Sequence, residues 1–215
     1  MFVKPDLDTL DLLSLLAVAG LALHWFKRQS HRQRTALLAS HLQPFQIERL
    51  MQQLTEGYLR ALGESDAQRQ AQVWAQYATA EQQLARQFQD FARAFAQVPA
   101  PQARTLRLAL PGIEKLWPQA SFDTRRMMQI HADGLARAVD NEAGLPPKDR
   151  AYLLMAEMFL MQHSCHWFCR SRTVASARML AQHNTQFVQA LEAVSSPTRQ
   201  AYLALLQGPA LAGPN

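Results

Sequence analysis

The chain has few of the residues that interrupt helices and few that form disulfides. Its 215 residues include only 8 glycines and 2 cysteines. No stretch shows the regular alternation of valine, isoleucine or threonine with polar residues that is typical of a half-buried strand. The cysteines, Cys165 and Cys169, lie in one apolar segment, unlike the scattered cysteines of a disulfide-stapled secreted domain. We therefore expect an all-α protein with reduced thiols.

The sequence also lacks the motifs of well-known enzyme chemistry. It contains no P-loop, dinucleotide fingerprint, nucleophile elbow or zincin motif. With 48% hydrophobic residues, the chain is too apolar for a disordered protein and long enough for one sizeable core. These observations favour a non-enzymatic interaction or scaffold protein, with no cofactor expected.

Positive charge is concentrated in one short segment. The net charge is +5, and four of the basic residues are Lys27, Arg28, Arg32 and Arg34, directly after an apolar run. From residue 35 onward, 17 lysines and arginines face 14 acidic residues, a surplus of three. A basic cluster beside an apolar segment indicates contact with anionic lipid, whereas a nucleic-acid-binding protein carries its charge along a binding face. We expect membrane lipid as a partner and no nucleic acid.

The apolar run itself predicts an N-terminal single transmembrane helix. Residues 12–26 read LLSLLAVAGLALHWF, with no charged residue and no polar face. At about 1.5 Å per residue they span roughly 22 Å, less than the ~30 Å hydrocarbon core. The positive-inside rule places the N-terminus outside and the rest in the cytoplasm, for a bacterial inner membrane. Residues 1–34 are thus predicted to be the membrane anchor with its basic juxtamembrane segment.

The next segment, residues 35–98, is predicted to be a long α-hairpin. Its first helix begins at Pro44 and ends at Gly63. Its second helix runs from Asp66 to Val98, with a capping box formed by Ser65 and Gln68. The second helix carries an apolar seam at heptad spacing, broken only by Glu81 and made of Trp74, Tyr77, Leu84, Phe88, Phe91, Phe95 and Val98. We expect residues 44–98 to be the surface that meets another protein or a second copy of this chain.

Prolines and glycines divide the remaining chain. Residues 99–112 are predicted to be a Pro-rich linker, residues 113–207 a C-terminal helical bundle, and residues 208–215 a flexible tail. Within the bundle we expect a helix capped by Ser121, a central helix through 151–169, one helix through 174–194, and a short helix over 197–207.

One group of side chains has two interpretations. Cys165, His166 and Cys169 fall within roughly 100° around a helix, so they could reach one soft or borderline metal ion, with His131 from the preceding helix as a fourth ligand. The alternative function is therefore a metal-binding or redox-responsive helical protein using residues 163–169. The favoured interpretation is a packing seam with buried thiols, because apolar residues repeat at 4, 3, 4, 3 spacing through Leu154, Met158, Met161, Cys165 and Phe168.

Overall fold

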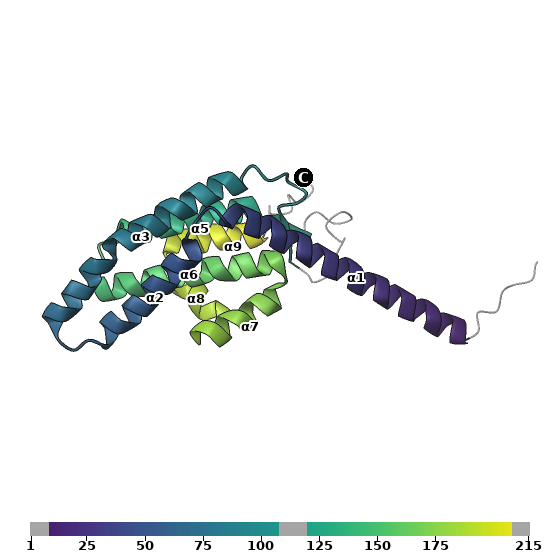
Figure 1. Cartoon of the computed structure of the whole chain (residues 1–215), viewed down its shortest axis with the longest axis horizontal. Helices are drawn as coiled ribbons and strands as arrows, with labels where there is room; N and C mark the ends of the chain where they lie inside the picture. The colour runs from purple at the N-terminus through teal and green to yellow at the C-terminus, as the bar shows by residue number, and fades with distance from the viewer. Residues whose placement is uncertain (1–8, 108–119, 208–215) are drawn as a thin grey trace, which may run out of the picture.

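The computed structural model describes residues 9–107 and 120–207. Within these ranges the protein has eight helices and one two-stranded antiparallel sheet, which confirms the all-α prediction. The predicted tail lies outside the described residues, as do residues 1–8 of the predicted anchor and 108–112 of the predicted linker. Figure 1 shows most helices packed into one body, from which the N-terminal half of the first helix projects alone.

That first helix, α1 (Thr9–Leu42), has two unlike halves. Its C-terminal half packs on the body: Leu38 is buried, and the ring of His41 lies edge-on to Phe95 with centroids 5.5 Å apart. Arg34 lies over the ring of Phe168. Its N-terminal half extends away from every other described helix (Figure 1).

The predicted hairpin forms from α2 (Ile47–Gly63) and α3 (Ala67–Phe95). Most residues at the predicted apolar spacing are buried, including Leu54, Leu84 and Phe88, because a 3-and-4 spacing places them on one helix face. Trp74 and Tyr77 are only partly buried. The predicted cap was wrong by one residue. Asp66 is the N-cap of α3, and its carboxylate accepts a hydrogen bond from the Arg69 amide at 2.8 Å.

Part of the predicted linker is ordered as a strand. β1 (Arg104–Leu106) pairs antiparallel with β2 (Ser121–Asp123), and Thr105 lies opposite Phe122. The next helix, α5 (Thr124–Val139), starts directly after β2. The prediction of Ser121 as its cap was wrong, because Ser121 belongs to the strand and Asp123 is the N-cap.

The centre of the body is α6 (Pro147–Cys169), as predicted. It contacts α1, α2, α5, α7, α8 and β1, so apolar side chains on all its faces find neighbours. One side packs toward the hairpin through Leu154, Met158, Met161 and Phe168. The other side packs toward β2, α5 and the C-terminal helices through Ala156, Leu160 and Trp167. The predicted 4, 3, 4, 3 seam is thus confirmed as core packing.

The C-terminal part contains α7 (Arg172–His183), α8 (Phe187–Ala193) and α9 (Ser196–Gln207). The prediction of one continuous helix through 174–194 was wrong. Asn184 has a left-handed backbone with φ 48°, and its amide donates to the Leu180 carbonyl at 3.0 Å, which ends α7. The break redirects the chain so that α8 can bury Phe187 and Ala190.

Candidate functional site

The N-terminal half of α1 concentrates the exposed apolar surface of the described residues. Nine of their fifteen exposed large hydrophobic side chains lie between residues 12 and 26. They are Leu12, Leu13, Leu15, Leu16, Val18, Leu21, Leu23, Trp25 and Phe26. Monomeric soluble proteins rarely expose contiguous patches of this kind, and such patches mark surfaces that contact a partner or a membrane.

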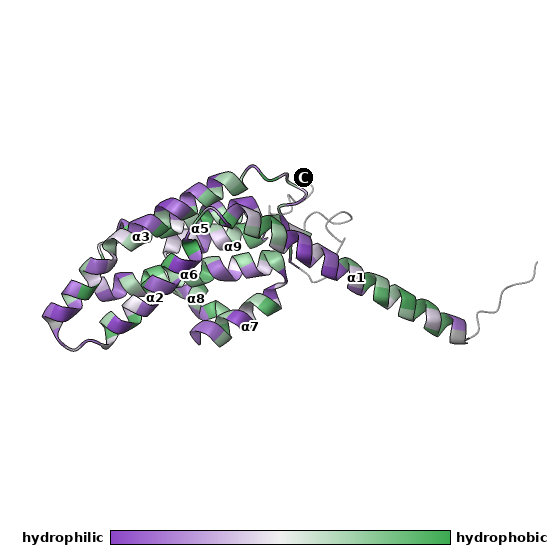
Figure 2. Cartoon of the chain, viewed as in Figure 1, coloured by the Kyte–Doolittle hydropathy of each residue, from purple (hydrophilic) through white to green (hydrophobic). Residues whose placement is uncertain are grey.

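This segment has no polar face. Figure 2 shows hydrophobic colour around the outer part of α1 and hydrophilic colour where the helix approaches the body. Lys27, Arg28 and Arg32 are exposed at that transition, while Arg34 is half-buried against the body. Among the described residues, no helix combines the length and apolar character needed to cross a membrane.

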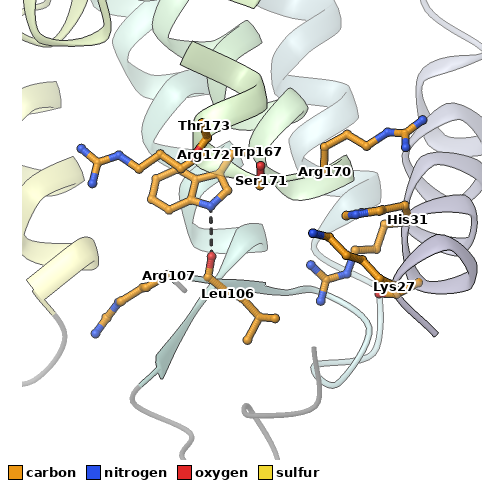
Figure 3. A pocket seen from close by; sticks show the side chains of 11 residues that line it. Lys27, His31, Leu106, Arg107, Trp167, Arg170, Ser171, Arg172 and Thr173 are labelled. Carbon is orange, nitrogen blue, oxygen red and sulfur yellow. Dashed lines mark hydrogen bonds between the residues drawn. The ribbon is translucent and has the colours of Figure 1, made fainter. Parts of the chain in front are cut away.

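A basic pocket lies where α1 joins the body (Figure 3). Its cavity has a volume of about 210 Å³ and is lined by α1, β1 and the connection from α6 to α7. Figure 3 shows Lys27 and His31 on one side of this basic pocket, Arg107 on the opposite side, and Trp167 between them. Of its eleven lining residues, five are lysine or arginine and none is acidic: Lys27, Ser30, His31, Arg34, Leu106, Arg107, Trp167, Arg170, Ser171, Arg172 and Thr173.

The pKa of His31 indicates the electrostatic environment of the basic pocket. Its Nδ1–H donates to the Cys169 carbonyl oxygen at 3.1 Å, which leaves Nε2 as the free ring nitrogen. Burial lowers the pKa of His31, the bond to the carbonyl raises it, and the charges of Arg170, Lys27 and Arg34 lower it. The surroundings of His31 therefore disfavour its protonated form.

The cysteines of the proposed metal cluster pack toward the hairpin side of α6. Both are partly buried against the larger apolar core. Burial is the main cause that raises the pKa of each thiol, and the other cysteine raises the pKa of Cys165 further. The thiolate is the nucleophilic form of cysteine, so these two thiols are poor nucleophiles at neutral pH.

His131 lies on the other side of α6. The Ser164 hydroxyl donates to the Leu160 carbonyl and accepts a hydrogen bond from His131 Nε2–H at 2.8 Å. Burial lowers the pKa of His131 to about 3, so its ring is neutral. His166 is half-buried beside Arg178 and His183. The described residues contain no group of three or more His, Cys, Asp or Glu side chains placed to hold a metal ion, so the four predicted ligands are not gathered at one point.

Sequence reasoning missed a buried polar cluster beside His131. Glu157, the only charge in 151–169, is fully buried and accepts a hydrogen bond from the Ser195 amide at 3.1 Å. It lies against Gly134 of α5, where a Cβ would come within 2.5 Å of Glu157 Oε2. The available signals were a single carboxylate in an apolar helix and a glycine in mid-helix. Neither signal identifies the partner, because Ser195 is 38 residues away.

A second buried carboxylate explains the break in the hairpin seam. Glu81 accepts hydrogen bonds from the Tyr58 hydroxyl of α2 and from Arg150 of α6. Burial raises the pKa of Tyr58, so it remains a neutral donor. The ion pair ties the hairpin to the central helix, a role that the heptad pattern does not reveal.

Comparison with known proteins adds no relative: no family model, no curated protein and no solved structure matches the chain.

Proposed function

We propose that this protein is a membrane-attached, non-enzymatic interaction protein, held to a bilayer by the apolar half of α1. The observation that carries the proposal is the set of exposed apolar side chains from Leu12 to Phe26, on a helix segment that no other described element covers. A helix that is apolar on all faces is stable only in an apolar environment. A bilayer provides that environment, and a helix satisfies its backbone hydrogen bonds internally, as lipid requires.

The basic residues support an orientation. Lys27, Arg28 and Arg32 are exposed at the end of the apolar segment, where they would meet lipid headgroups. The helix would enter the bilayer with its N-terminus first, and the body would remain on the cytoplasmic face. The full span predicted from the sequence, with the N-terminus outside, requires local thinning of the bilayer or snorkelling of Lys27 and Arg28, because residues 12–26 span only roughly 22 Å.

An interaction role is favoured over catalysis because two of the groups that could serve as an acid or a base are fully buried. His131 and Glu157 are both fully buried, so neither can reach a substrate. Part of the hairpin seam is also inside the body, since Leu84 and Phe88 are buried. A partner protein or second copy would therefore contact the outer face of the hairpin, which is rich in glutamine.

Vesicle flotation tests the attachment. The full chain should rise with neutral phosphatidylcholine vesicles, and Leu16→Lys should reduce the floating fraction strongly, because a lysine deep in a bilayer costs about 2.5–3.5 kcal/mol. Leu59→Lys is the matched control, since Leu16 is 59% and Leu59 61% exposed. Equal flotation of the two variants, or no flotation of the unaltered chain, would contradict the proposal.

A further inference from the structure

Two separate segments of the chain that meet where α1 joins the body carry no acidic residue. Residues 12–47, which cover nearly all of α1, contain four lysines and arginines and no aspartate or glutamate. Residues 158–191, from the second half of α6 into α8, contain three arginines and again no acidic residue. The first segment includes the apolar run, so the arginines after α6 add positive charge that lies far from that run in the sequence.

The fold brings these two segments together. His31 of α1 is bonded to the carbonyl oxygen of Cys169, the last residue of α6, at 3.1 Å. The following residue, Arg170, caps α6, and Arg172 is the first residue of α7. Figure 1 shows α1 leaving the body beside this connection from α6 to α7. Lys27 lines the same cavity as Arg170 and Arg172, so cations from both segments are neighbours in space.

Five exposed cations form what we call the basic face: Lys27, Arg28 and Arg32 of α1, with Arg170 and Arg172 of the connection from α6 to α7. The four ion pairs of the described residues involve none of them. Figure 3 shows the side chains of Arg170 and Arg172 extending in different directions, so they do not form one enclosed site. Exposed cations spread in this way suit an extended anionic surface better than a single small anion.

Helix geometry places this surface at the level of lipid headgroups. Phe26, the last residue of the apolar run, lies roughly 7.5 Å before His31 along the helix axis. The headgroup layer on each side of a bilayer is about 5–8 Å thick, because the bilayer measures ~40–45 Å and its hydrocarbon core ~30 Å. If the apolar run fills the hydrocarbon, Arg170, which follows the residue bonded to His31, lies beside the headgroups. We propose that the basic face docks the body of this protein on an anionic lipid surface.

This inference rests on the attachment proposed above and adds to it a second contact and a preference for anionic lipid. The field of an anionic membrane decays over about 8–10 Å near physiological salt, so Arg170 lies within it. Docking would hold the body with the connection from α6 to α7 toward lipid. The turn between α2 and α3, at the opposite end of the body in Figure 1, would then face away from the bilayer and stay free for a protein partner.

Flotation of the full chain at limiting lipid tests the docking, with phosphatidylcholine vesicles that either contain or lack phosphatidylserine. We expect phosphatidylserine to raise the floating fraction at low salt, and we expect high salt to remove most of that gain. Arg170→Gln combined with Arg172→Gln should lower partitioning into phosphatidylserine vesicles about 25-fold, since each basic residue near an anionic surface contributes about fivefold. Partitioning of this variant into pure phosphatidylcholine should be unchanged.

Two control variants separate charge from structure. Arg60→Gln combined with Arg86→Gln makes the same change of charge at exposed positions on the hairpin, and it should retain the gain from phosphatidylserine. Arg170→Lys combined with Arg172→Lys keeps both charges but removes the guanidinium that lies over the Trp167 ring, and it should also retain the gain. If the lysine variant loses as much as the glutamine variant, the two arginines have a structural role and the docking proposal is overturned.

Failure of the docking and failure of the attachment are distinguishable. Equal losses in the two glutamine variants, or no preference of the unaltered chain for phosphatidylserine, would overturn the docking even if the chain floats with neutral vesicles. An acidic protein would then be the better candidate for the basic face. Binding to phosphatidylserine vesicles that depends on Arg170 and Arg172, in a chain that does not float with neutral vesicles, would support the docking and contradict the attachment alone.

Discussion

Helix α6 and the N-terminal half of α1 are both apolar on all sides, yet they have opposite surroundings. Six elements of the body contact α6, and its large apolar side chains such as Leu160 and Phe168 are fully buried. The N-terminal half of α1 contacts none of these elements, and Leu16 and Leu21 are exposed. The comparison shows that hydrophobic content predicts only that a helix needs an apolar environment. Whether the protein itself supplies that environment depends on the fold.

Removal of a phenylalanine ring from each helix should separate the two environments most clearly. Phe168→Ala in α6 should lower the free energy of unfolding by about 3–5 kcal/mol, because Phe168 is fully buried and the deletion leaves a cavity. Phe26→Ala in α1 should change it by less than about 0.5 kcal/mol in detergent, since Phe26 is 60% exposed. Denaturant unfolding measures both. Similar losses would mean that the outer part of α1 packs on the body.

Acid should destabilise the body, because two buried histidines become protonated when the chain unfolds. Burial lowers the pKa of His131 to about 3 and that of His163 to about 4. A depressed histidine pKa means that the unfolded chain binds the proton first, so stability is full above about pH 6.5 and is lost as pH falls toward these values. The loss is at most about 1.4 kcal/mol per pH unit for each histidine. Between pH 6.5 and 5.5 it should be about 2 kcal/mol for both, because the unfolded histidines are only half protonated at pH 6.5.

Denaturant unfolding at several pH values checks this linkage. The His163→Asn variant should show a shallower dependence of stability on pH than the unaltered protein, because one of the two linked groups is gone. An unchanged slope would show that His163 is not buried in its neutral form.

A methyl group added at a glycine inside the body and at a glycine in the outer half of α1 should have opposite effects on stability. Gly134→Ala in α5 should destabilise the protein by about 1–3 kcal/mol, because the Cβ would lie 2.5 Å from Glu157 Oε2 and 2.6 Å from Thr198 Oγ1. Gly20→Ala in α1 meets nothing within 4 Å and should add helix stability of about 0.5–1 kcal/mol. Thermal unfolding of both variants measures the difference. A stable Gly134→Ala variant would show that the buried cluster can rearrange.

The regular parts of the fold could be predicted from local pattern. The 3-and-4 spacing of apolar residues predicted the hairpin and the central helix, and residues such as Leu84 and Leu154 are buried as expected. Helix ends were less accurate, because several residues near each end can act as a cap. The break at Asn184 could not be predicted from hydrophobic periodicity, which continues through it.

The candidate sites also differ in how much of each could be predicted from the sequence. The apolar segment of α1 is continuous in the sequence, so its pattern was visible, including the basic flank. The basic pocket combines His31, Arg107 and Arg170 from separate segments, and only the fold brings them together. The predicted metal ligands are not gathered at one point among the described residues: Cys165 belongs to α6 and packs against the larger apolar core, whereas His131 belongs to α5 and bonds to Ser164.

The most direct test of the central claim is the location of the outer part of α1 when the protein is bound to vesicles. A nitroxide at position 18, in a variant with both native cysteines replaced by alanine, reports collisions with oxygen and with a water-soluble nickel chelate. We predict high oxygen and low nickel accessibility at position 18, and the reverse for a nitroxide at position 59, which is similarly exposed in the structure. High nickel accessibility at position 18 on vesicle-bound protein would contradict the claim that lipid surrounds this half of α1.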